Sequence, residues 1–281
     1  MSYNNPNVEV FVPDGKKSPD CSNRTTYLTI AAHPDDIELM SSHEIIKCIN
    51  DSDKWFGGVV LTDGTGSARS GMYSQYDDQQ MKSIRAKEQK KAAFLGEYSI
   101  QYLMNYTSKQ VKEENNGLIE DLQNIILSTS PKIVYTHSIF DRHETHRATA
   151  IKVIQAIRSL PEKYKPQKIY GCEVWGSLDW VPNEYKMVFK YNNHENLLTS
   201  LVNLYDSQIN GGKEYGEAIM GRRKANAVFH EMQAIENNIL SSFAIDLTEL
   251  ICNSNMNILE YANIYIDRFK EEMLNQIKKM V

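Results

Sequence analysis

The sequence has 281 residues, of which 41% are hydrophobic and 24% charged, and its formal net charge is −5. This composition is typical of a globular protein with room for one large domain, and the negative charge gives no general attraction to nucleic acid or to an anionic membrane surface. No stretch approaches about 20 consecutive apolar residues, the length needed to span a bilayer, so no membrane span is expected.

The N-terminus and the cysteines indicate the compartment. Residues 1–24 are polar and lack the apolar core of a signal peptide, so we expect a polar N-terminal extension. The four cysteines, Cys21, Cys48, Cys172 and Cys252, are widely separated and form no C-x-x-C pair. We therefore expect free thiols in a reducing compartment and a cytoplasmic protein.

A polar turn between a strand and a helix is the first candidate site. Residues 27–32 are apolar and partly β-branched, which predicts a strand, and residues 37–50 follow a helical pattern. His33, Asp35 and Asp36 stand between them, beyond the carboxyl end of the strand, where ligands collect in open α/β sheets. These side chains would repel one another unless a cation or substrate organised them. Asp36 could equally cap the helix, and this stretch alone favours capping and metal ligation equally.

The next segments alternate between strand and helix patterns. Strands are predicted over 56–62 and 99–104, and helices over 77–95 and 113–128. This alternation favours a Rossmann-like α/β fold, with a mainly parallel sheet flanked by helices and joined by right-handed crossovers.

A long loop rich in Gly, Ser and Tyr follows the strand at 56–62. Loops of this length usually cover a site or are disordered, and we interpret this one as a substrate-covering loop. Its tyrosines and Arg69 are expected to contact a sugar. A Gly-rich phosphate cradle is the competing interpretation, but the chain has no G-x-x-x-x-G-K pattern after a strand here.

A second polar cluster follows another predicted strand, residues 131–136. His137, His143 and His146 lie in this window, and a helix is expected from 145 to 159. His143 and His146 are three residues apart, so both imidazoles lie on one side of the first helical turn.

Together, the two clusters favour a metal site. A lone histidine is more often a satisfied core or surface residue than a ligand, but two clusters at two strand ends are harder to explain in that way. Catalytic zinc sites take three protein ligands of the His and Asp type and keep a fourth position for water. His33, Asp36 and either His143 or His146 would make such a set.

The last third of the chain is predicted to be mainly helical. A strand at 168–174 and a loop with Trp175 and Trp180 precede it; the tryptophans lie on the expected ligand side, although burial is their commoner fate. Helices are expected over 195–208, 215–238 and 255–280, with a short strand at 244–247. The last helix carries an apolar stripe that we expect to pack on the domain, with a homo-oligomer contact as the alternative; it consists of Ile258, Tyr261, Ile264, Tyr265, Phe269 and Met273.

Four motifs stand in order along the chain: Ala32-His-Pro-Asp-Asp36, Val60-Leu-Thr-Asp-Gly64, Arg85-x-x-Glu88 followed by Ala92-Ala-Phe-Leu-Gly96, and Asp141-Arg-His-Glu-Thr-His146. Together they resemble the PIG-L / LmbE-like de-N-acetylases, zinc-dependent hydrolases that remove an acetyl group from N-acetylglucosaminyl compounds and similar amides. Ser207-Gln208 resembles a weaker feature of that family. The resemblance implies a catalytic domain over residues 25–210, and we expect residues 211–281 to be a helical addition packed on it.

The resemblance also implies roles for individual residues. His33, Asp36 and His146 would hold Zn²⁺, although a site with two His and one Asp also suits Fe²⁺. Asp35 would be the general base for a metal-activated water. His143 would polarise the acetyl carbonyl or protonate the leaving amine.

The substrate would be a small N-acetylated molecule. By analogy with the family Arg85 would contact it, although a helix-face pair of Arg85 with Glu88 explains that arginine equally well. Asp63 and Arg69, at the start of the long loop and within it, complete the expected substrate-binding set.

Two positions depart from the family pattern. Thr145 stands where the family has an aspartate that orients the catalytic histidine, so Glu144 or Asp141 would have to substitute. Ser42-His43 replaces a common Gly pair, and we interpret His43 as structural or pocket-lining. Thr145 is the feature that favours the alternative function, a non-catalytic metal- or sugar-binding protein of the same fold. A phosphoesterase would need more ligands, for a two-metal site, than these motifs provide.

Overall fold

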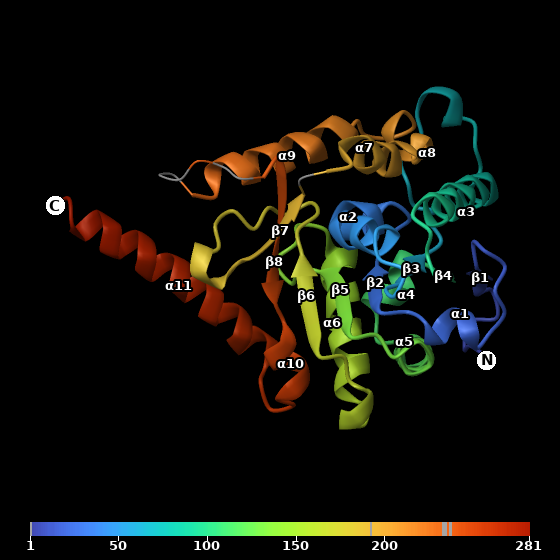
Figure 1. The fold of residues 1–281 in the computed structure, drawn as a ribbon, viewed down its shortest axis with the longest axis horizontal. Helices are drawn as coiled ribbons and strands as arrows, with labels where there is room; N and C mark the ends of the chain where they lie inside the picture. Colours follow the sequence, from blue (N-terminus) through green and yellow to red (C-terminus); the bar gives the residue numbers. More distant parts are fainter. Residues whose placement is uncertain (1, 192, 232–234, 236–237) are drawn as a thin grey trace.

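The computed structural model describes residues 2–191, 193–231, 235 and 238–281, and its centre is an eight-stranded sheet (Figure 1). The strand order is β1-β4-β3-β2-β5-β6-β8-β7. The strands are β1 (Glu9–Phe11), β2 (Tyr27–Ala31), β3 (Phe56–Thr62), β4 (Ile100–Tyr106), β5 (Ile133–His137), β6 (Lys168–Cys172), β7 (Met187–Tyr191) and β8 (Leu240–Asp246).

The central part of the sheet is parallel. The pairs β4–β3, β3–β2, β2–β5 and β5–β6 are parallel, whereas β1, β8 and β7 join antiparallel at the two ends. This arrangement confirms the predicted Rossmann-like α/β class.

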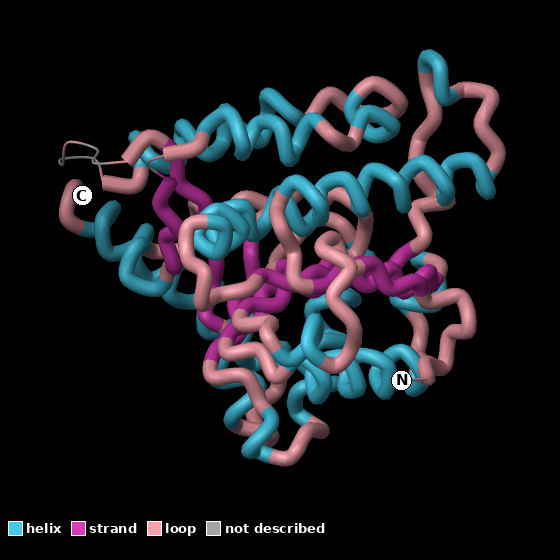
Figure 2. The backbone as a smooth tube through the Cα atoms, turned by 45° about the vertical axis from the view of Figure 1, so that its right-hand side comes forward, coloured by secondary structure: helices cyan, strands magenta, loops and turns pink. Residues whose placement is uncertain are grey.

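Helices cover both faces of the sheet (Figures 1 and 2). One layer contains α2 (Asp36–Ile49), α3 (Asp78–Leu95), α7 (Glu195–Asn203), α8 (Asp206–Ile209) and α9 (Gly216–Phe229). On the other side lie α1 (Asp20–Asn23), α4 (Ser108–Lys112), α5 (Asn116–Thr129), α6 (Glu144–Arg158), α10 (Thr248–Cys252) and α11 (Ile258–Lys278). Short 3₁₀ turns stand at Gly71–Tyr73, Glu162–Tyr164 and Asn183–Tyr185. Within the described residues, no helix is both long and apolar enough to cross a bilayer.

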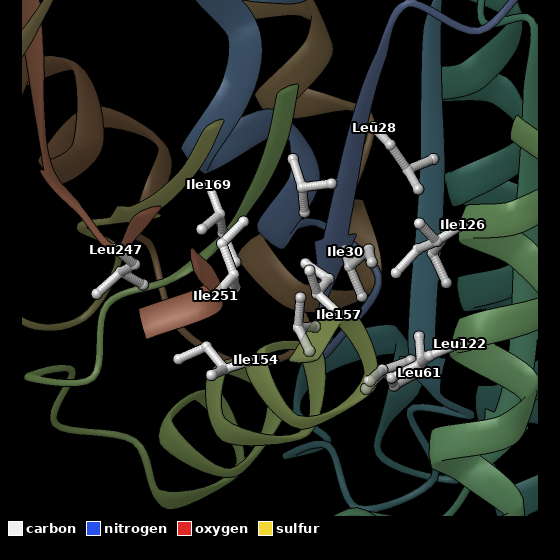
Figure 3. Packing of buried hydrophobic residues seen from close by; sticks show 14 of the residues in the cluster. Leu28, Ile30, Leu61, Leu122, Ile126, Ile154, Ile157, Ile169, Leu247 and Ile251 are labelled. Atoms are coloured by element: carbon white, nitrogen blue, oxygen red, sulfur yellow. The ribbon is translucent and has the colours of Figure 1, made fainter. Parts of the chain in front are cut away.

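The core lies on both faces of β2. Leu28 and Ile30 pack into the cluster formed with α5 and α6 (Figure 3), whereas Tyr27 and Ala31 pack into the cluster that contains residues of α2. A parallel strand covered on both faces is an almost continuous apolar run, which is why residues 27–32 were recognisable as a strand.

The N-terminal segment is tied to the domain. The sequence predicts a polar extension, but β1 pairs with β4, and the backbone N–H of Asn4 donates to Asp121 Oδ1 at 2.7 Å. Strand β1 has only three residues at the edge of the sheet, and its Val10 is exposed, so the short segment gave no recognisable strand pattern. Strand β7, at the other edge, was also not predicted, and the short strand predicted at 244–247 is the longer β8.

Several predicted helices are shorter or divided. The helix expected at 113–128 is α5, which begins at Asn116 and is preceded by the separate, unpredicted helix α4. The Asn115 side chain caps α5 by accepting the N–H of Leu118. The helix expected at 195–208 is divided into α7 and α8. The helix expected at 215–238 ends at Phe229, and residues 232–234 and 236–237 of that prediction lie outside the described residues.

Helix α11 leaves the body of the domain toward the C-terminus (Figure 1). Of its predicted apolar stripe, Tyr261 and Tyr265 are buried, whereas Ile264 is 37% exposed and Phe269 36%. The packing expected for this stripe is therefore partial, and the homo-oligomer contact stays a prediction.

Helix α2 bends at Ser41, next to the Ser42-His43 pair. Ser41 has non-helical backbone angles (φ −125°, ψ 18°). The buried guanidinium of Arg223, from α9, donates to the carbonyls of Glu38 and Leu39 at 3.1 Å. The carbonyls freed at the bend therefore accept hydrogen bonds from Arg223. The same contacts connect α9 to α2, the helix that begins at the candidate site.

Candidate functional site

The two polar clusters meet where the sheet order changes direction. β2 and β5 are parallel neighbours, with Tyr27 opposite Ile133 and Thr29 opposite Tyr135. In the sheet, β3 and then β4 lie next to β2, whereas β6 lies next to β5 on the other side of the pair. Ligands of open α/β sheets bind outside the carboxyl ends of the strands at such a switch point.

The three predicted metal ligands lie together. His33 Nδ1 is 3.1 Å from Asp36 Oδ2 and 3.1 Å from His146 Nε2, and His146 Nε2 is 3.3 Å from Asp36 Oδ2. Tetrahedral ligands at the usual zinc distances are roughly 3.3 Å apart, so the three atoms have the spacing of one coordination sphere. The donor set fits a zinc or iron ion. Asp36 does not cap α2; it accepts the backbone N–H of His33 at 2.8 Å.

The charges of the site favour a cation at His146. Burial lowers the pKa of His146, but Asp36 and Asp141 on its two sides outweigh burial and raise it to about 10. Burial lowers the pKa of His33 to about 4, so its imidazole is neutral, the form that binds metal. The carboxylates of Asp36 and Asp141 thus lie on the two sides of the His146 ring, and their negative charge favours a cation at this position.

A second triad of possible ligand atoms is less suitable. Asp36, His137 and His146 also have ligand atoms close together. However, His137 Nε2 accepts the backbone N–H of Ala32 at 2.9 Å, so its lone pair is in use. The His137 ring stacks on His146 with centroids 3.9 Å apart and thereby holds the ligand loop. His33, His143 and His146 form a third possible set.

Asp35 lies beside the ligands as a buried carboxyl group. Its Oδ2 accepts from Tyr215 Oη at 2.7 Å and from Arg85 Nη2 at 3.2 Å. Burial, opposed by Arg85, raises the pKa of Asp35 to about 7. Its φ of +108° lies in the region that L-residues rarely adopt. A carboxyl group with this pKa next to a metal site is suited to general-base chemistry at neutral pH.

His143 precedes the first turn of α6 and lines the same cleft. Its Nδ1 accepts the backbone N–H of Thr145 at 3.2 Å, which assigns the proton to Nε2. Burial lowers the pKa of His143, and this keeps the ring neutral. His143 is therefore a neutral hydrogen-bond donor through Nε2.

Glu144 and Asp141, the two carboxylates expected to take over the role of the family's aspartate at position 145, both have other partners. Glu144 is exposed and lies 3.5 Å from Lys112 Nζ. Asp141 Oδ1 is 3.2 Å from His146 Nδ1 and accepts the backbone N–H of His143 at 2.8 Å. Asp141 therefore orients the ligand His146, and a backbone N–H sets the tautomer of His143.

A cleft of about 620 Å³ opens over these residues. Its walls come from the loop at 64–68, from α3, α4 and α6, from Trp175 and from residues 208–215. Arg85 lines the cleft but is 2% exposed, and its guanidinium also bonds to Ser67 and the Pro34 carbonyl.

The other predicted substrate contacts have partners in their own loop. Arg69 donates to the carbonyls of Thr65 and Tyr76 at 2.9 Å and pairs with Asp78. Asp63 accepts from the hydroxyl of Thr65 at 2.9 Å. In this structure both residues shape the loop beside the cleft, and their contact with substrate stays a prediction.

The segment that carries these ligands matches a known family model. Residues 28–157 match the family model described as PIG-L, GlcNAc-PI de-N-acetylase. The resemblance to the PIG-L family is confirmed. The matched segment contains His33, Asp35, Asp36, His143 and His146. No curated protein matches the chain.

Solved structures share the fold of this PIG-L-like chain. The N,N′-diacetylchitobiose deacetylase of Pyrococcus horikoshii is 17% identical, covers 84% of this chain and 90% of its own, and has a TM-score of 0.62. The zinc-inhibited form of teicoplanin deacetylase is 12% identical, with 79% and 97% covered and a TM-score of 0.56. The 4-carboxy-2-hydroxymuconate hydratase of Pseudomonas putida is 14% identical, with 79% and 96% covered and a TM-score of 0.64. These likenesses establish the fold, and the hydratase illustrates that one fold serves different reactions.

Some residues of the cleft lie beyond the PIG-L match, and two of them, Tyr215 and Lys213, were missed. Tyr215, Gln208 and Lys213 come from the last third of the chain, and Lys213 Nζ lies 4.9 Å from the Trp175 ring centre. Nothing local in the sequence marks Tyr215, because its partner Asp35 is 180 residues away. Of the two tryptophans, Trp175 lines the cleft, whereas Trp180 packs against Phe140.

Proposed function

We propose that this protein is a metal-dependent hydrolase that removes the acetyl group from an N-acetylated amino sugar or a related small molecule. The observation that carries the proposal is the buried Asp35 carboxyl next to the His33–Asp36–His146 triad, with Asp35, His33 and Asp36 lining one cleft. The PIG-L match and the deacetylases that share the fold support the same reaction class.

His33, Asp36 and His146 would hold the metal, with Zn²⁺ as the expected ion and Fe²⁺ as the alternative. When bound, such a cation lowers the pKa of a coordinated water and polarises an amide carbonyl. Asp141 would keep the His146 ring in place through Nδ1.

Asp35 would take the proton from the attacking water. Its two side-chain donors, Arg85 and Tyr215, both bind Oδ2, so we assign the proton transfer to Oδ1. The water oxygen adds to the acetyl carbon, and the proton then passes to the amide nitrogen as the C–N bond breaks. The products are acetate and the free amine.

His143 would stabilise the charge that develops on the acetyl oxygen. Its Nε2 carries the proton, because Nδ1 accepts the backbone N–H of Thr145. A donor placed for a developing oxyanion stabilises the transition state more than the ground state.

The alternative is a binding protein of the same fold that performs no turnover. Thr145 in place of the family's aspartate supports it. The buried Asp35, held in strained geometry by two donors, supports catalysis instead, because ligand binding alone has no use for such a carboxyl. The cytoplasmic location remains part of the proposal, supported by four free cysteines.

The first test joins metal analysis with amine release from a panel of N-acetylglucosamine conjugates. We expect about one zinc or iron per chain and acetate release that stops on chelation and returns with metal. Metal bound without turnover on any conjugate would favour the binding protein. A chain that takes up no metal after reconstitution would contradict the ligand assignment.

A further inference from the structure

The Tyr215 hydroxyl makes a hydrogen bond to the candidate base from outside the PIG-L segment. Its Oη lies 2.7 Å from Asp35 Oδ2, and Tyr215 stands at the N-terminal end of α9 and lines the cleft. Hydrogen bonds to an ionised carboxylate are about twice as strong as those between neutral groups. This contact therefore links the last third of the chain directly to the candidate base.

The surroundings of Asp35 explain why a second donor matters. Arg85 reaches the same oxygen at 3.2 Å, and its guanidinium is itself fixed by Ser67 and by the Pro34 carbonyl. The backbone N–H of Asp35 donates to Gln89 Oε1 at 3.2 Å. These contacts fix the backbone and one side of the carboxylate, but a single longer contact from Arg85 leaves rotation about the Asp35 side chain possible.

We propose that Tyr215 is a positioning residue for Asp35. Its hydroxyl and Arg85 together hold Oδ2, and this fixes the direction in which Oδ1 faces the water. The inference rests on the proposed function, since it assigns Asp35 the role of base. It adds a residue to the site that lies beyond both the matched segment and the predicted catalytic domain.

The test is the Tyr215→Phe variant, which removes one oxygen and keeps the ring. We expect kcat to fall about 10- to 100-fold, because small misplacements of a catalytic group have effects of this size. KM and the metal content should stay close to wild type, since the ring and the three ligands are unchanged. A role in folding alone would lower thermal stability without this division between kcat and KM.

The chain offers a matched control. Tyr106 Oη donates to Asp121 Oδ2 at the same 2.7 Å, in a buried pair that belongs to β4 and α5. Tyr106→Phe removes an equal Tyr–Asp hydrogen bond whose partners are neither Asp35 nor a proposed ligand, so it should lower stability and leave kcat unchanged. Equal kcat values for Tyr215→Phe and wild type would overturn the inference.

Crystal structures of the wild-type protein and of Tyr215→Phe give a readout that needs no substrate. We expect the Asp35 carboxylate to rotate from its wild-type position, while His33, Asp36 and His146 stay in place. An unmoved carboxylate would contradict the positioning role. If the wild-type protein hydrolyses none of the conjugates, the proposed function fails, whereas the comparison of the two crystal structures still decides whether Tyr215 positions Asp35.

Discussion

The Nδ1 atom of His146 lies 3.2 Å from Oδ1 of Asp141, on the side of the ring opposite Asp36. A carboxylate in this place fixes the tautomer and plane of a ligand imidazole and makes its other nitrogen a better donor to metal. The His146 hydrogen bond helps to lower the pKa of Asp141 to about 2 against the effect of burial, so Asp141 is ionised at neutral pH.

Replacing Asp141 by Asn should therefore weaken metal binding. We expect the dissociation constant for Zn²⁺ to rise about 10- to 100-fold, measured by competition with a chromophoric chelator. Glu144→Gln, which changes a neighbouring exposed carboxylate, is the control and should bind zinc as wild type does. Unchanged affinity in the Asp141 variant would remove Asp141 from the account of the site.

The Asp35→Asn variant tests the general base. The side chain keeps its size but loses the ability to accept a proton, so we expect kcat to fall about 10²- to 10⁴-fold. Metal content should stay the same, because Asp35 is not among the proposed ligands. Asp53→Asn, on the exposed surface, is the control. A variant with wild-type turnover would rule out Asp35 as the base.

His143→Ala distinguishes two arrangements of the metal site. If His33, Asp36 and His146 are the ligands, the variant should keep its metal and lose about 10²- to 10³-fold in kcat, as when an oxyanion donor is removed. His146→Ala should lose the metal itself. Elemental analysis of both purified variants provides the measurement, and loss of metal from His143→Ala would instead favour the set His33, His143 and His146.

Glu173 gives a prediction for stability against pH. Its carboxylate is buried and accepts the backbone N–H groups of Leu178 and Phe243 at 3.0 Å. Burial raises the pKa of Glu173, although these donors oppose it. The folded protein therefore keeps a proton on Glu173 at pH values where the unfolded chain, with a pKa of about 4.3, has lost it.

The sign of the effect follows from that difference. Where the folded state binds more protons, stability falls as pH rises, from about 4.3 up through the raised folded pKa. Urea unfolding of wild type and Glu173→Gln between pH 4.5 and 7.5 should show the wild-type free energy of unfolding decreasing relative to the variant. The exposed Glu184→Gln variant should give a constant difference, and a constant difference for Glu173→Gln would contradict the prediction.

The sequence was sufficient to predict the elements that show a local pattern of apolar residues. Strand β3 has the predicted bounds, because a buried parallel strand is a continuous apolar run. The meeting of His33 and Asp36 with the segment of His143 and His146 also followed from the sequence, since polar residues at the carboxyl ends of parallel strands share one edge of the sheet. The choice of His146 as the ligand came from the family resemblance.

Contacts between distant segments could not be predicted in the same way. Tyr215 and Asp35 share no spacing or periodicity, and the short edge strand β1 reaches β4 through backbone pairing. The assignment of Asp141 to His146, rather than to His143, depends on how the turn before α6 folds. The residue types alone did not decide whether Asp141 contacts His143 or His146.

The backbone conformation of Asp35 affects which residue selection retains at this position. A φ of +108° suits glycine, and a side chain there costs about 1–3 kcal/mol of conformational strain. Contacts with Arg85 and Tyr215 offset part of that strain, but they need a side-chain oxygen, which glycine lacks. Selection for folding and selection for chemistry therefore oppose each other at this position, and a sequence optimised for stability alone would carry glycine where this protein carries aspartate.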